Sequence, residues 1–131
     1  MKDKCLKMHN KNVGKIGEDI ACKYLIEKGY AILERNYVEK GGEIDIIARN
    51  GREIIFVEVK ARCSKKNGDG IESITWQKIR HIKNVSKIYV LKKRLFNYSI
   101  RYDAIDINFS RTSHSINHIK AIIWIINISL I

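Results

Sequence analysis

The chain has 131 residues, enough for one domain with a hydrophobic core and too few for two independent ones. Hydrophobic residues make up 45% and charged residues 30% of the sequence, a balance that excludes a disordered or fibrous protein. The formal net charge is +11, so the expected partner is a polyanion, with nucleic acid first and an anionic membrane surface second.

Targeting and redox features favour a cytoplasmic protein. The three cysteines are far apart and form no C-x-x-C pair, so neither a disulfide framework nor a zinc knuckle is expected. Residues 1–12 lack the apolar stretch of a signal peptide. The apolar tail at residues 121–131 is shorter than the roughly 20 residues that span a bilayer, so no stable membrane insertion is expected.

The first predicted element is an amphipathic helix at residues 14–28. Apolar side chains recur there at helical spacing, and Gly29 is a natural residue just past a helix end. Glu18 lies on the border of the apolar stripe, close to Leu25. It is therefore the acid of this helix that we expect to face whatever the helix packs on.

Three strands are predicted next, with a turn at residues 39–42. Alternating apolar residues and β-branched runs place the strands at residues 30–36, 43–49 and 53–61. In the third strand, the charged Glu58 and Lys60 share one face and Val57 and Val59 the other.

The second and third strands are predicted to form a hairpin around Asn50-Gly51, because both residues tolerate the positive φ of a type I′ turn. With these residues at the centre, we expect Asp45 opposite Phe56 and Glu43 opposite Glu58. Asp45 and Glu58 are then diagonal neighbours with Cα atoms ~7–8 Å apart, close enough for their carboxylates to share a cation.

The second half of the chain is predicted to hold a loop, a basic helix and further strands. Residues 62–70 are polar and contain glycine, which favours a loop, and residues 75–94 alternate apolar and basic groups at helical spacing. Residues 101–107 predict another strand, and the remaining sequence leaves two alternatives, a last strand or an apolar tail. The order of elements predicts a single α/β domain around one sheet.

Four residues can meet at one place in this fold: Glu18, Asp45, Glu58 and Lys60. Converging carboxylates repel each other unless a divalent cation lies among them, and Mg²⁺ prefers such oxygen ligands and keeps several waters. A lysine beside a bound metal can hold or help deprotonate one of these waters. The combination predicts metal-assisted hydrolysis of a phosphodiester bond.

Each of these features has a plainer alternative. Asp45, Glu58 and Lys60 can form an ordinary cross-strand ion pair on a solvated face. The apolar Ile54 and Phe56 on the same face instead predict that a helix covers it, and charges buried under a helix are costly unless they are paired or bind a metal. Glu18 can be a solvated helix residue, and Glu43 is a rival ligand or a residue that caps the start of its strand. The basic helix can serve solubility alone, and the aromatic residues Trp76, Tyr89 and Tyr98 favour packing over base stacking.

The motifs GEIDIIA (42–48) and FVEVKAR (56–62), with GKIGEDIACKYLIEKGYAILERNY (14–37) upstream, resemble the YraN-type family of small uncharacterised bacterial proteins. That family is grouped with the restriction-endonuclease-like PD-(D/E)xK superfamily and is similar to Holliday-junction resolvases. The resemblance covers about residues 11–120 and implies a mixed sheet flanked by helices, in the order α-β-β-β-α-β. Ile44 precedes Asp45 where proline is usual, and the tail differs from the usual family ending.

The resemblance implies an endonuclease that hydrolyses phosphodiester bonds in structured DNA, with Mg²⁺ or Mn²⁺ as its cofactor. Asp45 and Glu58 would bind the metal together with the main-chain carbonyl of Val59. Glu18 would ligate through a water or at a second position. Lys60 would orient the attacking water and offset charge on the phosphate.

Phosphate contacts are expected from the basic side chains Arg62, Lys78, Arg80, Lys83 and Lys87. For Lys78, near the start of the second helix, there are two alternatives, since it can reach the acidic site itself or a phosphate. DNA is favoured over RNA, and a homodimer is compatible with junction resolution because two cuts usually need two sites. Two alternatives stay open: a catalytically silent nucleic-acid-binding or adaptor module of the same fold, and a membrane-surface protein.

Overall fold

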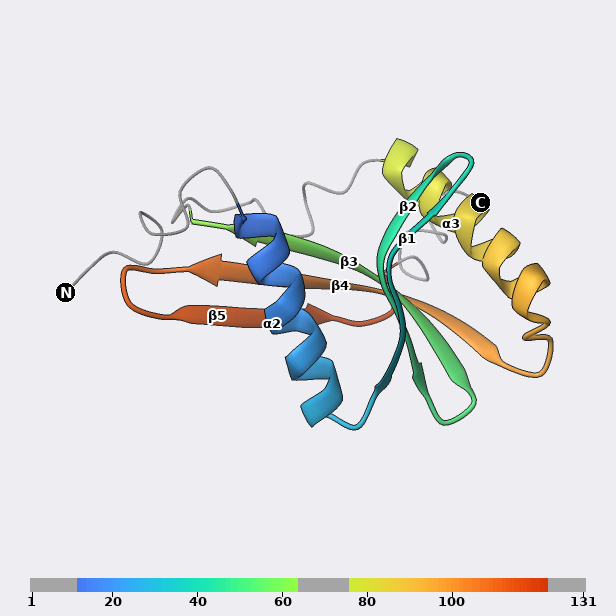
Figure 1. Ribbon diagram of the computed structural model, residues 1–131, viewed down its shortest axis with the longest axis horizontal. Helices are drawn as coiled ribbons and strands as arrows, with labels where there is room; N and C mark the ends of the chain where they lie inside the picture. Colours follow the sequence, from blue (N-terminus) through green and yellow to red (C-terminus); the bar gives the residue numbers. More distant parts are fainter. Residues whose placement is uncertain (1–11, 64–75, 123–131) are drawn as a thin grey trace.

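Five strands form one mixed sheet in which spatial order follows chain order (Figure 1). The computed structural model describes residues 12–63 and 76–122. β3 and β4 pair in parallel, and the other neighbouring strands pair antiparallel. The strands are β1 Ala31–Glu39, β2 Gly42–Asn50, β3 Glu53–Arg62, β4 Ser99–Phe109 and β5 His114–Ile119.

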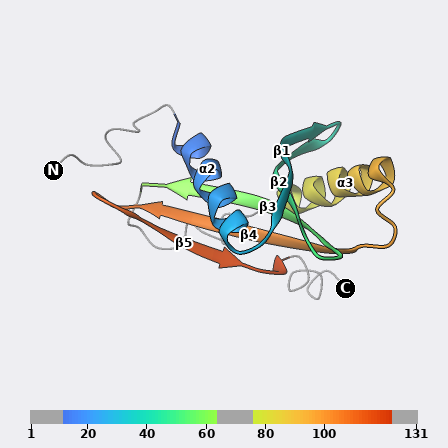
Figure 2. The ribbon, with the colours of Figure 1, turned by 60° about the horizontal axis from the view of Figure 1, so that its bottom comes forward.

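Two helices cover opposite faces of this sheet. α2 (Val13–Glu27) packs against a buried cluster that includes Ile55 and Val57 of β3, whereas α3 (Trp76–Lys93) packs against a cluster that includes Ile54 and Phe56 of the same strand. Successive side chains of a strand point to opposite faces, so the two clusters alternate along β3. Figure 2 shows α2 over β3, β4 and β5, and α3 beside the β1–β2 hairpin.

The predicted order of elements is confirmed, and both helices lie within two residues of their expected bounds. The apolar side predicted for the second helix is buried on the sheet, as Ile79, Ile82, Val85 and Tyr89 are each less than 5% exposed. The last strand, which the sequence left open against an apolar tail, is present as β5.

Several predictions concern residues outside the described ranges. These are the loop at residues 64–70, the tail at residues 123–131, the N-terminal residues 1–11 and the side chain of Trp76. Neither α2 nor α3 combines the length and the apolar character needed to cross a bilayer.

The hairpin between β2 and β3 turns one residue later than predicted. Asn50 pairs with Glu53, so the central turn residues are Gly51 and Arg52. Gly51 has a φ of 62°, and glycine is the residue that a type II′ turn takes at its first central position. The turn therefore places its positive φ on Gly51, for which that conformation costs least, and Asn50 joins the strand.

This turn shifts the register of β2 against β3 from the predicted one. The predicted partners Asp45–Phe56 and Glu43–Glu58 are wrong, because Phe56 pairs with Ile47. The β2–β3 ladder ends at Ile46 opposite Val57, so Asp45 and Glu58 come directly after the last paired residues of the two strands. The two carboxylates still lie close together, since the charge of Asp45 is one cause of the raised pKa of Glu58, but they are not the diagonal ladder neighbours that the sequence analysis predicted.

β2 and β3 separate beyond this last pair. Their ladder runs as far as Ile46 opposite Val57, after which β2 continues to pair with β1 and β3 continues to pair with β4. In Figure 1 the β1–β2 hairpin bends away from the rest of the sheet toward α3. Asp45 lies at this fork, where its Oδ2 accepts a hydrogen bond of 2.8 Å from the backbone N–H of Val59.

A buried polar network that the sequence analysis did not foresee joins β4 to β5 and α2. The fully buried carboxylate of Asp103 accepts hydrogen bonds of 2.9 Å from Arg101 and 3.0 Å from the backbone N–H of Ala121. It also lies 2.7 Å from Nε2 of His118, whose Nδ1 lies 3.0 Å from the hydroxyl of Tyr24. Both ring nitrogens of His118 thus have a partner within this network.

Gly17 sets how closely α2 approaches the sheet, and its replacement is the first test. A Cβ atom at Gly17 would overlap the side chain of Ala61 in β3. We expect Gly17→Ala to lower the free energy of unfolding by about 1–3 kcal/mol, measured by urea denaturation, because overpacking forces backbone shifts.

Gly14→Ala in the same helix is the matched control, since an added Cβ there meets nothing within 4 Å. We expect it to raise the free energy of unfolding by up to about 1 kcal/mol, the difference in helix propensity. Equal effects of the two substitutions would contradict the close approach at Gly17.

Candidate functional site

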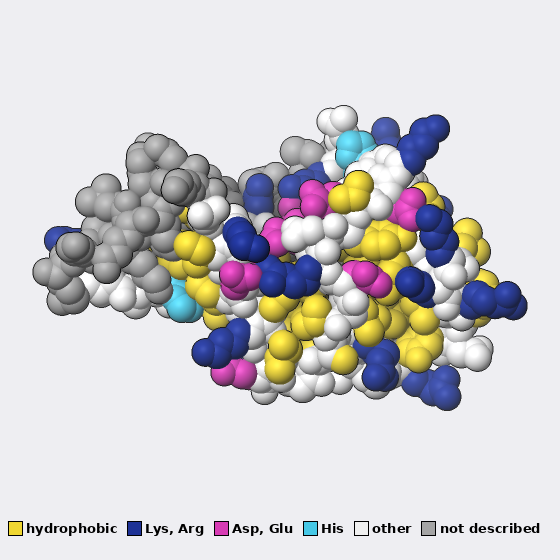
Figure 3. Space-filling model, in the orientation of Figure 1, with side chains coloured by type: hydrophobic (Ala, Val, Ile, Leu, Met, Phe, Trp, Pro, Cys, Tyr) yellow, Lys and Arg dark blue, Asp and Glu magenta, His cyan; other side chains and the backbone are white. Residues whose placement is uncertain are grey.

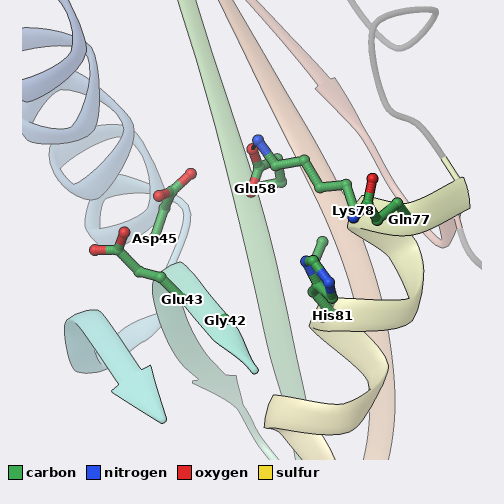
Figure 4. Close-up of a pocket in the computed structure, with 8 residues that line it drawn as sticks. Gly42, Glu43, Asp45, Glu58, Gln77, Lys78 and His81 are labelled. Carbon is green, nitrogen blue, oxygen red and sulfur yellow. Dashed lines mark ion pairs between the residues drawn. The ribbon is translucent and has the colours of Figure 1, made fainter. Parts of the chain in front are cut away.

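The candidate site is a pocket of about 320 Å³ at the fork between β2 and β3. The first turns of α3 close its opposite side, as Figure 4 shows. Three elements therefore contribute to one cavity, and its lining includes three carboxyl side chains and one lysine ammonium. The lining residues are Gly42, Glu43, Asp45, Glu58, Gln77, Lys78, His81 and Ile82.

Glu58 is the buried acid of this pocket, with 4% of its surface exposed. It follows Ile54 and Phe56 on the face that α3 covers, so the alternation of β3 carries it into the interior. Burial first, and then the negative charge of Asp45, raises the pKa of Glu58 to about 7. An ion pair with Lys78 of α3 acts in the opposite direction.

Glu18 lies beside Asp45 but outside the pocket wall. Its Oε1 accepts a hydrogen bond of 2.9 Å from Asn36 and lies 3.7 Å from Arg35, both in β1. Burial, followed by the charge of Asp45, raises the pKa of Glu18. The fold thus brings Glu18 close enough to feel the charge of Asp45, while Glu18 is not among the residues that line the pocket.

Asn36 is a residue at the site that the sequence analysis missed. It adopts a left-handed conformation with a φ of 52° while it holds the Glu18 carboxylate. Non-glycine residues rarely adopt this region, and asparagine is among those that tolerate it best. That tolerance was the only signal in the sequence, and it does not point to a site.

Lys60 lies on β3 two residues beyond Glu58, where it is half-buried and aligned with Asp106 of β4. It forms no ion pair with any residue that the structure describes, and it is not among the described pocket-lining residues. Its predicted role beside a metal therefore stays a prediction.

The five predicted phosphate contacts fall into three groups. Arg62 is engaged by Asp106, with 3.1 Å between Nη2 and Oδ2, and Lys78 is engaged by Glu58. The remaining three lie along α3, where two are exposed and one is half-buried: Arg80, Lys87 and Lys83. In Figure 3 some lysine and arginine side chains lie at the upper right, where α3 lies in that view, and others are spread over the rest of the visible face.

Gln77 and His81 complete the α3 side of the pocket, and the sequence analysis did not select them. Their four-residue spacing places them one helical turn apart with Lys78 on the same edge. Gly42 lets the hairpin approach this edge, because a Cβ there would lie 3.1 Å from Cβ of His81. The sequence signal that could have found them is that polar residues recur one helical turn apart at the start of α3.

The donors in the pocket fit a hard divalent cation. Within the described residues no group of three or more His, Cys, Asp or Glu side chains could together hold a metal ion, but Asp45 and Glu58 lie close together and the more exposed Glu43 lines the same pocket. Mg²⁺ is usually bound by one or two carboxylates and keeps several waters. A buried carboxyl with a pKa of about 7 beside a second acid is a position where added positive charge is favourable.

The fold and site are those of an α/β protein with an acidic pocket at a forked sheet, and comparisons with known proteins identify its family. The model of the uncharacterised protein family UPF0102 matches residues 17–107. The chain belongs to this family, which is the YraN-type family that the sequence motifs predicted.

Relatives named UPF0102 protein align over most of their own length. One from Clostridium perfringens strain 13 is 44% identical over 117 residues, which cover 88% of this chain and 96% of the relative. One from Clostridium kluyveri is 45% identical over 113 residues, covering 86% and 92%. One from Dictyoglomus turgidum is 44% identical over 110 residues, covering 84% and 93%.

The raised pKa of Glu58 predicts a pH-dependent stability in the metal-free protein. A carboxyl whose pKa rises from 4.5 to about 7 on folding contributes stability that is fully present below pH 4.5 and is lost as the pH rises through about 7. Glu58→Gln is neutral at every pH, so we expect its free energy of unfolding to fall less over this window. Urea denaturation in EDTA at several pH values measures the difference.

Glu43→Gln is the control, because Glu43 lies on the exposed side of the same pocket. We expect this variant to keep the wild-type pH dependence. A wild-type slope in Glu58→Gln would show that Glu58 is not the buried acid described here.

Proposed function

We propose that the protein is a metal-dependent endonuclease that hydrolyses phosphodiester bonds in structured DNA. The observation that carries the proposal is the buried carboxylate of Glu58 close to Asp45 at the fork, with Lys60 two residues further along the same strand. Two acids and a lysine in this relation match the D…ExK pattern of the PD-(D/E)xK nucleases that the sequence resembles. The pocket opens between the sheet and a helix whose outer side is basic.

Asp45 and Glu58 would hold Mg²⁺ or Mn²⁺, with the main-chain carbonyl of Val59 as a third ligand and Glu18 acting through a water. Such a cation, when bound, activates a phosphate and makes a bound water more acidic. Asp45 is already oriented by its hydrogen bond to the Val59 N–H. Lys60 orients the attacking water and offsets charge on the phosphate.

The basic surface supplies the affinity for the substrate in this proposal. Arg80, Lys83 and Lys87 follow one side of α3, and the chain carries a net charge of +11. Contacts of this kind neutralise backbone phosphates, so binding is independent of sequence and weakens with salt. Arg62 adds positive charge at the end of β3 while it is bound to Asp106. In this proposal the protein is cytoplasmic and its substrate is DNA. A homodimer is favoured because resolving a junction takes two cuts and usually two sites.

One observation favours a second candidate, a nucleic-acid-binding or adaptor module that has the same fold and does not turn over. Lys78 already balances the charge of Glu58 through an ion pair, so the described pocket has a counter-charge without a metal. A module that only binds nucleic acid needs no carboxylate-dependent cation site. Cleavage and metal titration therefore separate the two candidates.

The nuclease proposal predicts that purified protein with Mg²⁺ or Mn²⁺ cuts branched, flapped or single-stranded DNA. We expect Asp45→Ala, Glu58→Ala and Lys60→Ala to lower the cleavage rate by roughly 10²–10⁴-fold, because each removes a group that acts on the metal or the attacking water. Gel assays measure the rate, and circular dichroism checks the fold of each variant.

Asp19→Asn is the matched control, since Asp19 is an acid next to Glu18 that binds Arg35 on the exposed side of α2. It should cut like the wild type. A protein that cuts no DNA or RNA with either metal, or a Glu58→Ala variant with wild-type activity, would contradict the proposal.

The same proposal predicts that Mg²⁺ binding releases protons. The Glu58 carboxyl, with a pKa of about 7, is partly protonated at neutral pH and must ionise to bind a cation. Calorimetric titrations in buffers of different ionisation enthalpy should give up to about one proton per ion at pH 6.5 and fewer at pH 8.5. Binding without a pH-dependent proton release, or no binding, would count against a site at Glu58.

A further inference from the structure

The ammonium of Lys78 is paired with a carboxylate, that of Glu58, which is one of the proposed metal ligands. The Glu58 carboxylate is 4% exposed, while the side chain of Lys78 is 40% exposed. The lysine thus reaches inward from the first turns of α3 to a buried acid and keeps its stem at the mouth of the pocket. Its charge partner is fixed in a strand, whereas the lysine stem has four rotatable bonds on an open side.

A cation between Asp45 and Glu58 and the ammonium of Lys78 compete for the same oxygen atoms. Both are positive, and their mutual repulsion is strong where burial lowers the effective dielectric constant. The Glu58 carboxylate can therefore be balanced by the lysine or by the divalent ion, and binding of one weakens the hold of the other.

The pocket offers the released lysine a second anionic partner. Lys78 lines the cavity together with Gln77 and His81, so its ammonium remains among polar groups when it leaves Glu58. A phosphodiester positioned at the metal site brings negative charge into the same cavity. The lysine that neutralised Glu58 is then within reach of a phosphate.

We propose that Lys78 is an exchangeable counter-ion that binds Glu58 in the metal-free protein and a nucleic-acid phosphate once a divalent cation occupies the site. The inference rests on the proposed metal site and deepens it by coupling metal binding to substrate binding. A bound cation displaces Lys78 from Glu58, so the lysine becomes free to bind the phosphate. A bound phosphate attracts Lys78 away from Glu58, so the charge that repels the cation is removed. By thermodynamic linkage, each must then raise the affinity of the protein for the other.

The test measures Mg²⁺ affinity of the full chain and of Lys78→Gln without nucleic acid. Calorimetric titrations from pH 7 to 9, fitted with one linked proton, give the affinity of the ionised site. We expect Lys78→Gln to bind Mg²⁺ roughly threefold or more tightly than the wild type, because a competing charge is gone. Lys78→Arg restores the charge and should return the affinity toward the wild-type value.

Lys93→Gln is the matched control, because it removes one exposed charge from the last turn of the same helix, away from the pocket and from the expected phosphate contacts. It should leave Mg²⁺ affinity near that of the wild type. A fluorescein-labelled phosphorothioate duplex, which resists hydrolysis, then reports substrate binding. Mg²⁺ should tighten duplex binding by the wild type and by Lys93→Gln, and Lys78→Gln should lose most of this gain.

A third measurement follows the lysine itself. In ¹⁵N-labelled metal-free protein, the Nζ resonance of Lys78 should show the slow solvent exchange of an ion-paired ammonium, and Mg²⁺ alone should shift it and speed the exchange. An unchanged Lys78 resonance at saturating Mg²⁺ would contradict the proposed displacement of Lys78 from Glu58.

The outcomes separate this inference from the proposed function. Absence of Mg²⁺ binding by the wild type would overturn both. Binding that depends on Asp45 and Glu58, with equal or weaker affinity in Lys78→Gln, would overturn the role of Lys78 alone. A purely structural ion pair would lower the stability of Lys78→Gln without tightening Mg²⁺ binding.

Discussion

The burial of the Glu58 carboxylate beside Asp45 is the constraint on which the rest of the site depends. β3 must place Ile54 and Phe56 under α3 to form one of the two hydrophobic clusters, and the period of two then carries Glu58 to the same covered face. A charge in that environment needs a proton, an ammonium or a metal ion as its partner. Burial accounts for both the pKa of about 7 and the ion pair with Lys78, because each places a positive charge or a proton on the buried carboxylate.

The fork in the sheet gives the buried acid access to solvent. If β2 and β3 stayed paired beyond Ile46 and Val57, the hairpin would close over Glu58 and no pocket would form. Asp45 instead satisfies the N–H of Val59 with its own carboxylate, so the strands part at little cost in backbone hydrogen bonds. The repulsion between the two acids is a local cost in stability, and strained electrostatics of this kind cluster at functional sites.

Local patterns predicted the elements, and long-range contacts decided the site. The alternation in IIFVEVKAR correctly placed Glu58 on a helix-covered face, and helical periodicity located α2 and α3. The register around Asn50-Gly51 was predicted wrongly because that dipeptide allows two turns, and the observed one places the positive φ on Gly51. The fork depends on residues distant in sequence that meet in space, for which one sequence holds no direct signal. The sequence allowed Lys78 to reach either the site or a phosphate, and only the structure shows its ion pair with Glu58.

The central claim is that Asp45 and Glu58 form a divalent cation site, and an anomalous difference map from crystals grown with MnCl₂ tests it most directly. The account predicts a manganese peak between the two carboxylates, within ligand distance of the Val59 carbonyl, with the Lys78 ammonium displaced from Glu58. A map without a peak in this pocket at saturating Mn²⁺, with Lys78 still paired to Glu58, would contradict it.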